Sequence, residues 1–474
     1  MPLLRTEVIK QTCTILTAGL LMSWPALYNG YPLLYPDSMS YLQGGELVWR
    51  ALWQHQFSAE YDGRSLVYGL GILPLHWKGV VWPIVAFNAL VTAYVVWLVV
   101  RSILPKATAI HYFGLLMPLC LLTGLGWYVG WIMPDIFGPV LYLSIYLLVF
   151  AEELSASERT LVVLIAWWAV ASHITHLMLA VGVCGALVAV SQLQRQCTRA
   201  RLRAVAGVLL IVLVAAAAQV ALNTYLYGEP SLIGKGPAFL MARIIGDGPG
   251  KWYLQRHCGQ VKLSVCDRVD ELPDNAGDFL WAPEGIWINS SPEEQEQLRR
   301  DEIPLLLGTL REYPREELVV AVENFWQQLH TFALSNYDAN SWTLEMVDIV
   351  LPGGRAIYLR SRQQQERLHE GFFTRVESWT VAASLGMIGV SFLFMRGRWP
   401  SRLVSLAVLI VFVVIANAAV TGILSNVDDR YQGRVIWLLP LLAGLLLLTW
   451  VDQRRKARAL SSPESIKLFH STTA

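Results

Sequence analysis

The sequence predicts an α-helical membrane protein that crosses the bilayer about ten times. Three observations lead to this fold class. The 474 residues are 54% hydrophobic and only 15% charged, whereas a soluble protein carries about 25% charged residues. Apolar runs of membrane length recur along the chain, and basic residues gather in alternate connections between them. The net charge of +1 gives no support to a nucleic-acid partner.

Each expected span is an apolar run of roughly 17 to 25 residues, the length needed to cross the hydrocarbon core. The first is expected to be a retained helix and not a cleaved signal peptide, because its apolar stretch exceeds a usual signal core. The fifth is the shortest. The ten spans are expected at residues 12–28, 80–102, 109–128, 134–151, 160–173, 176–193, 204–226, 378–395, 403–425 and 435–451.

The basic residues in the short connections predict the orientation. With ten spans they all fall on one side, which is expected to be cytoplasmic. The acidic turn at residues 152–159 falls there too, but acids count little in this rule. We therefore expect a multi-pass protein of a bacterial inner (plasma) membrane, with both termini in the cytoplasm. The basic residues are Arg5 and Lys10; Arg101 and Lys106; Arg195, Arg199, Arg201 and Arg203; Arg396, Arg398 and Arg402; and Arg454, Arg455, Lys456 and Arg458.

Two large segments are then expected on the opposite, periplasmic side. The spans divide the chain into an N-terminal membrane module at 1–226, an extracytoplasmic domain at 227–377, and a C-terminal membrane module with a cytoplasmic tail at 378–474. The first module contains an outer loop at about 29–79. The inserted domain is expected to be mostly helical, since Ser291-Pro292-Glu293-Glu294 has the cap, proline and acids of a helix start.

Two acids lie at the outer water boundary. Asp37 follows the first span within Tyr35-Pro36-Asp37-Ser38, and Asp135 follows Pro134 at the start of the fourth. A carboxylate beside hydrocarbon is a candidate base for a lipid-borne substrate. The alternatives are that Asp37 caps a helix and that Asp135 is a first-turn acid favoured by the helix dipole.

Three arginines lie at the same boundary and are candidate phosphate ligands, because a guanidinium fork matches phosphate geometry. They are Arg64, Arg430 and Arg434. The alternatives are ion pairs with neighbours in sequence (Asp62 for Arg64, Asp428 and Asp429 for Arg430) or contact with lipid head groups.

His173 and His176 mark the outer boundary between the fifth and sixth spans. Their spacing places both on one helical face, where they could contribute to an acceptor pocket or hold a metal; interfacial hydrogen bonding is the commoner role of such residues. Cys258 and Cys266 lie eight residues apart in the expected outer domain, on the oxidising side of the membrane. We expect a disulfide between them, with two buried free thiols as the alternative.

Four stretches, in their order and sidedness, resemble the GT-C class of integral-membrane glycosyltransferases. They are residues 35–42, with an acid just beyond span one; 63–70, an arginine-containing entry into span two; 133–137, a second acid at the start of span four; and 430–441, a late Arg-Tyr entry into the closing helix. The resemblance covers the first seven spans and the last two. The chain departs from the class in its large outer domain, which interrupts the membrane part instead of following it.

The resemblance implies a glycosyltransferase, with a single inverting displacement. Moving a sugar from a lipid phosphate needs a base for the acceptor, cations for the departing phosphate and exclusion of water. Asp37 is the expected base, with Asp135 as the second acid, and Arg64, Arg430 and Arg434 are the expected phosphate ligands. His173, His176, Tyr35 and Tyr431 are expected to be acceptor or accessory residues. The donor would be a polyprenyl-phosphate sugar and the acceptor a glycan, lipid or protein. No cofactor is certain, and a divalent cation shared by the two acids stays open.

Other functions remain open at this point. A polymerase or ligase of lipid-linked glycans would also use a large outer loop, but would depend on outer-loop arginines instead of an acid after span one. A transporter or flippase would have broken helices in two related halves, which the sequence does not show. A non-catalytic assembly protein is a further alternative.

Overall fold

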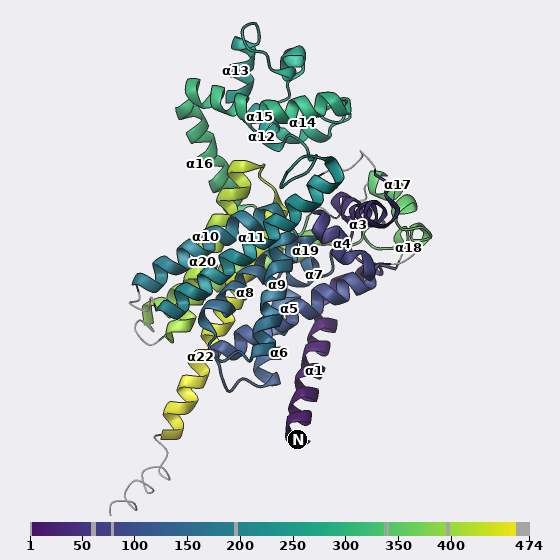
Figure 1. Cartoon of the computed structure of the whole chain (residues 1–474). Helices are drawn as coiled ribbons and strands as arrows, with labels where there is room; N and C mark the ends of the chain where they lie inside the picture. The colour runs from purple at the N-terminus through teal and green to yellow at the C-terminus, as the bar shows by residue number, and fades with distance from the viewer. Residues whose placement is uncertain are drawn as a thin grey trace, which may run out of the picture.

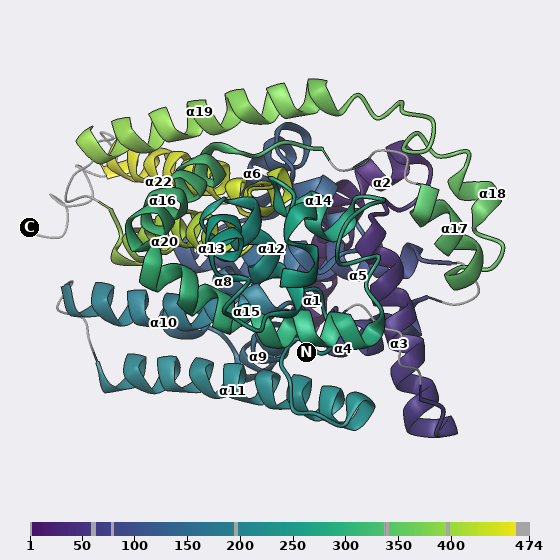
Figure 2. The ribbon, with the colours of Figure 1, turned by 90° about the horizontal axis from the view of Figure 1, so that it is seen from above.

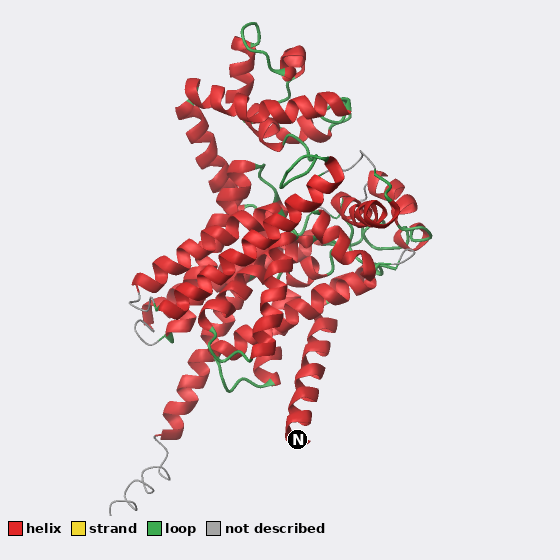
Figure 3. Cartoon of the chain, in the orientation of Figure 1, coloured by secondary structure: helices red, strands yellow, loops and turns green. Residues whose placement is uncertain are grey.

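The computed structural model describes residues 2–57, 63–76, 80–193, 198–335, 337, 341–394 and 399–460; side chains of residues 2–6 and 457–460 are not described. Every regular element within these ranges is helical (Figure 3). One parallel bridge joins Leu33 and Trp131. The tail beyond residue 460, expected in the cytoplasm, lies outside the described residues.

The membrane part is a bundle of long helices that agrees with the predicted fold class (Figure 1). Six segments are long and apolar enough to cross a bilayer by length and composition: α5, α10, α11, α19, α20, and α21 with α22. The protein is therefore a multi-pass membrane protein. The remaining predicted spans coincide with α1, α6, α8 and α9, so the count of ten stays a prediction. The bundle helices are α1 (Pro2–Met22), α5 (Trp82–Ile103), α6 (Ala109–Leu122), α8 (Phe137–Phe150), α9 (Ala156–Ala171), α10 (Ile174–Leu193), α11 (Arg199–Tyr227), α19 (Glu370–Phe394), α20 (Ser401–Leu424) and α22 (Leu438–Leu460).

The seventh and eighth predicted spans begin five and eight residues earlier than expected, at Arg199 and Glu370, and three other spans are broken by short helices. The first begins ten residues earlier and ends at Met22, because Ser23 leads into a second helix whose first turn contains Pro25. The third ends at Leu122, where Thr123 adopts an extended backbone. The last is divided at Trp437 into α21 (Asp429–Ile436) and α22. Each break lies at one end of a short helix, and apolar run length cannot reveal such breaks.

Helix α8 is the centre of the bundle, since all of its residues from Phe137 to Phe150 are buried. A helix that is apolar on all sides must be enclosed by others. Figure 2 shows α19 along one edge of the bundle and α10 with α11 along the opposite edge. Asp135, the second candidate acid, lies in the short helix η2 (Pro134–Ile136), which leads directly into the buried helix α8.

Ion pairs place several connections at one end of the bundle. Arg101 pairs with Glu158 and Arg402 pairs with Glu153, each at 2.7 Å. The start of α1 and the end of α22 lie at this same end in Figure 1. We call it the basic end. The acidic turn at 152–159 therefore lies beside arginines of the basic connections, as the topology requires.

The opposite end, which we call the domain end, carries the helices of the first loop and of the inserted segment (Figure 1). Helix α2 (Trp24–Asn29) leads into the first loop, which contains α3 (Pro36–Gln54), α4 (Leu66–Ile72) and η1 (Leu73–Leu75). Helix α7 (Leu125–Val129) also lies at this end. The inserted segment contains α12 (Phe239–Gly246), α13 (Pro249–His257), η3 (Ser264–Glu271), α14 (Ala276–Trp281), α15 (Pro292–Glu312), α16 (Pro314–His330), α17 (Ser341–Val350) and α18 (Arg355–Tyr358).

The inserted segment has two parts. Residues between Ala238 and Leu305 form a hydrophobic core separate from that of the bundle, and Cys258 and Cys266 are joined there by a disulfide. Helices α16 and α17 instead pack against elements of the membrane part, α16 on α20 and α17 on α3. The chain thus leaves the bundle, forms a small domain and returns over the first loop.

Candidate functional site

Asp37 lies in the first turn of α3, at the domain end of the bundle. The start of this helix is satisfied without it: the Ser38 hydroxyl accepts a hydrogen bond from Tyr35 N, and Ser38 N donates to Tyr35 O. The Asp37 carboxylate instead accepts from Arg64 Nη2 at 2.5 Å and from Arg430 Nη1 at 3.5 Å. Helix capping therefore does not explain this aspartate.

Arg430 connects the two candidate acids. Its backbone N–H donates to Asp428, which caps α21, whereas its guanidinium turns inward between Asp37 and Asp135. The distance from Arg430 Nε to Asp135 Oδ1 is 3.9 Å. The rings of Tyr35 and Tyr431 lie 4.7 and 5.0 Å from this guanidinium and enclose it by cation–π contacts. Asp428, one of the sequence neighbours considered as an ion-pair partner of Arg430, accepts a hydrogen bond from the Arg430 backbone.

Arg434 lies one helical turn further along α21 and is fully buried. Its Nη1 is 3.6 Å from Asp135 Oδ1, and its Nη2 donates to Asn417 at 3.0 Å and to Thr175 at 3.3 Å. Asn417 and Thr175 were not among the residues selected from the sequence. A polar side chain inside an apolar run was the available signal for Asn417, since such groups need a partner in the membrane.

The five charged side chains form what we call the Asp37 cluster: Asp37, Asp135, Arg64, Arg430 and Arg434. Three guanidinium groups share two carboxylates, which leaves one net positive charge. Within the described part of the chain, Arg430 Nε, Arg434 Nη1 and Asp135 Oδ2 are buried without a hydrogen-bond partner. Buried donors beside excess positive charge are suited to an anion with several oxygens, such as a phosphate.

The charge of Asp37 follows from two opposed effects. Burial raises the pKa of this carboxyl, but the neighbouring Arg64 and Arg430 outweigh burial and hold the pKa below its ordinary value. Asp37 is therefore ionised at neutral pH. It can accept a proton efficiently only after the arginines have turned to another anion.

The two histidines lie beside the cluster without joining it. His173 Nδ1 lies 2.9 Å from the Thr175 hydroxyl, which also contacts Arg434. His176 Nδ1 lies 2.8 Å from the carbonyl oxygen of Ala169, and the two imidazole rings are 5.3 Å apart. The described residues contain no group of three or more His, Cys, Asp or Glu side chains that could hold a metal ion.

The inserted segment packs against the stretch of the first loop that carries Arg64. Gly63, with a positive φ of 75°, lies so close to Gly236 that a Cβ built on Gly63 would be 2.2 Å from the Gly236 Cα. This contact sets Arg64 beneath the inserted segment, with its guanidinium 5.8 Å from the Phe239 ring. The predicted partner Asp62 lies outside the described residues.

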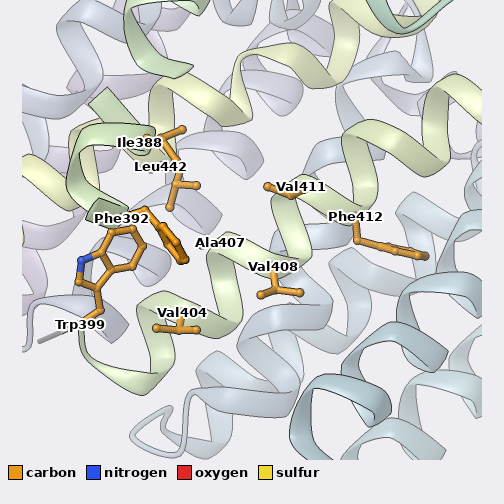
Figure 4. Close-up of a pocket in the computed structure, with 10 residues that line it drawn as sticks. Ile388, Phe392, Trp399, Val404, Ala407, Val408, Val411, Phe412 and Leu442 are labelled. Carbon is orange, nitrogen blue, oxygen red and sulfur yellow. The ribbon is translucent and has the colours of Figure 1, made fainter. Parts of the chain in front are cut away.

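An apolar groove of about 610 Å³ lies elsewhere, between α19, α20 and α22 (Figure 4). Phe392 and Trp399 lie at one end of it and Phe412 at the other. It is on the half of α19 and α20 that leads to the basic end, and no charged side chain lines it. It is separate from the Asp37 cluster.

The comparisons with known proteins are sparse. No protein-family model matches the chain, and no solved structure matches it. The chain is 29% identical over 103 residues to the uncharacterized protein YdiM of Bacillus subtilis (strain 168), a match that covers 22% of this chain and 71% of that protein.

Proposed function

We propose that the protein is a membrane glycosyltransferase of the GT-C type, which transfers a sugar from a polyprenyl-phosphate donor to a glycan, lipid or protein acceptor. The observation that carries the proposal is the Asp37 cluster at one end of a membrane bundle, where an ionised Asp37 pairs with Arg64 and Arg430 and the second acid, Asp135, lies beside Arg434. A lipid phosphate would lie near one end of a membrane-spanning bundle, and the reaction needs both a base and cations there.

The reaction would proceed as one displacement. The acceptor hydroxyl gives its proton to Asp37 while its oxygen attacks the anomeric carbon of the sugar. The bond from that carbon to the phosphate oxygen breaks, and its electron pair leaves with the phosphate. The polyprenyl phosphate gains one negative charge as Asp37 loses one, so the charge of the whole site is conserved while Arg64, Arg430 and Arg434 stabilise the departing group.

The location follows from the sidedness of the charges. The basic residues favour the cytoplasm for the basic end, which would place the Asp37 cluster on the periplasmic side of a bacterial inner membrane. A cluster at the end of the bundle favours an enzyme acting on a lipid head group over a transporter, whose site would lie near the midplane.

The decisive experiment is Asp37→Asn. The purified protein would be assayed in lipid nanodiscs with a panel of radiolabelled polyprenyl-phosphate sugars and membrane extract as acceptor, following release of polyprenyl phosphate. Because asparagine keeps the size of aspartate but does not accept the proton, transfer should fall at least about a hundredfold. Donor binding should not weaken, and thermal stability should be retained.

Glu153→Gln provides the matched control, since it also removes one arginine-paired acid, at the basic end. It should leave transfer unchanged. If the Asp37→Asn protein transfers sugar at the normal rate, Asp37 is not the base, and the proposal of a GT-C glycosyltransferase fails with it. If Asp37→Asn stays active and only the variants of the cluster arginines lose activity, the polymerase or ligase would be favoured.

A further inference from the structure

The chain between α2 and α3 is held on both sides by residues distant in sequence. On one side, Leu33 N donates to Gly130 O and Ile132 N donates to Leu33 O, both at 3.0 Å. On the other side lies the buried Gln363. Its Oε1 accepts a hydrogen bond from Leu34 N at 3.1 Å, and its Nε2 donates to Leu34 O at 2.6 Å. The side chain of Gln363 thus takes the place of a neighbouring strand.

Gln363 is itself fixed by the end of α2. Its backbone N–H donates to Asn29 Oδ1 at 2.8 Å, and Arg362 N donates to Asn29 O at 3.0 Å. Asn29 Nδ2 in turn donates to Tyr31 O at 2.7 Å. Gln363 and Asn29 are each only 2% exposed, so water does not compete for these bonds.

The consequence falls on Asp37, three residues after Leu34. Both backbone polar groups of Leu33, Leu34 and Tyr35 have partners, the last through Ser38. A segment whose backbone groups are all paired inside a dry site has few alternative conformations. The orientation of the chain that leads into Asp37 is therefore fixed by Gln363, near the end of the inserted segment and 329 residues from Leu34.

We infer that Gln363 is a positioning residue for Asp37: by pairing both backbone groups of Leu34 it holds the Asp37 carboxylate in place between Arg64 and the acceptor. The inference rests on the proposed function, because it assigns Gln363 a part in the same reaction. The side-chain hydrogen bonds of Gln363 go to Leu34, so its effect passes through the backbone of residues 34–37.

The test uses Gln363→Met, which keeps the length of the side chain but can neither donate nor accept at Leu34. Hydrogen exchange measured by mass spectrometry on the full chain in nanodiscs should show the peptide 31–38 exchanging at least about tenfold faster. Peptides from α13 in the small domain should exchange as in the wild type. Gln365→Ala is the matched control, because Gln365 is an exposed glutamine two residues away.

The kinetic part separates positioning from general damage. In Gln363→Met, kcat for sugar transfer should fall about ten- to a hundredfold while KM for the donor does not rise. In an Asp37→Asn background the same substitution should add no further loss, since its effect passes through Asp37. Gln363→Glu keeps the acceptor for Leu34 N but loses the donor to Leu34 O, and should also impair transfer.

Each outcome has one meaning. Faster exchange at 31–38 with an unchanged kcat would overturn the inference, as would unchanged exchange. A further loss of rate in the double variant would assign Gln363 a general structural role and also overturn it. If the wild type transfers no sugar from any donor, the proposed function fails, while the exchange measurement still decides whether Gln363 fixes the Asp37 segment.

Discussion

Arginine–carboxylate pairs occur at both ends of this helical bundle, but their arrangement differs. At the basic end Arg101 pairs with Glu158 and Arg402 with Glu153, one acid to each arginine, with 16–35% of each side chain exposed. At the domain end three arginines share two acids, and Arg434 and Asp135 are almost fully buried. The first arrangement neutralises its charges in contact with water. The second keeps positive charge and unused donors in a dry place, which a protein without a ligand for them would have reason to avoid.

The largest expected difference between the two ends concerns stability. Asp135→Asn should destabilise the protein by about 3–5 kcal/mol, because it leaves the buried Arg434 without a countercharge. Glu158→Gln at the basic end should cost only about 0–1 kcal/mol, since that pair is partly solvated. Thermal unfolding midpoints in one detergent would compare the two variants. Equal midpoints would show that burial does not distinguish the ends.

The second largest expected difference between the two ends concerns anion affinity. Arg64→Ala and Arg430→Ala should each weaken binding of farnesyl phosphate by about 1.5–3 kcal/mol, the value of a lost charge-assisted hydrogen bond. Arg101→Ala removes the same charge at the basic end and should bind as the wild type does. The measurement is calorimetric titration in nanodiscs. Unchanged affinity in both domain-end variants would leave these arginines as structural ion pairs.

A third effect has the opposite sign. Asp37 occupies the donors of Arg64 and Arg430 in the structure, so a phosphate must displace it. Asp37→Asn should therefore bind farnesyl phosphate about tenfold more tightly, roughly the value of one such bond. Glu153→Gln, which removes an acid at the other end, should not change the affinity. Weaker binding by Asp37→Asn would mean that Asp37 helps to hold the anion instead of competing with it.

The smallest effect is expected for the exposed pairs. Arg402→Ala should lower the free energy of unfolding by no more than about 1 kcal/mol, because its pair with Glu153 is about one third exposed on each side. Raising the ionic strength should remove most of that difference. Chemical denaturation at low and high salt would measure it, and a large salt-independent loss would show that the basic end is as tightly coupled as the domain end.

The sequence predicted the regions where local pattern decides the structure. Apolar runs gave the positions of the long helices, and the boundary positions of Asp37, Asp135, Arg64, Arg430 and Arg434 gave the members of the cluster. Their mutual contacts could not be read from the sequence, because Arg64, in the loop before α4, and Arg430, in α21, are brought to Asp37 by parts of the chain far apart in sequence. The sequence did not show that Arg434 is the most deeply buried of the three arginines.

Other features left no pattern to read. Gln363 lies in an irregular segment between α18 and α19, and its partners are backbone groups that any residue at position 34 would present. The break between α6 and α7 lies inside a continuous apolar run. There Glu377 of α19 accepts a hydrogen bond from Gly124 N at 2.7 Å, a pairing between residues 253 positions apart. Such long-range bonds between side chain and backbone have no periodicity or spacing.

The close approach of Gly63 to Gly236 has a consequence for how the protein can be divided. A chimera that exchanged the whole of residues 227–377 for the equivalent of another protein would remove the glycine against which the Arg64 segment rests, and Gln363 with it. Loss of activity in such a hybrid would then report a collapsed site and not a changed choice of acceptor. The boundary at which this chain can be divided without disturbing the Asp37 cluster therefore lies inside the inserted segment, at the separate core between Ala238 and Leu305. A chimera joined at the two ends of that core would keep Gly236 and Gln363 with the membrane part.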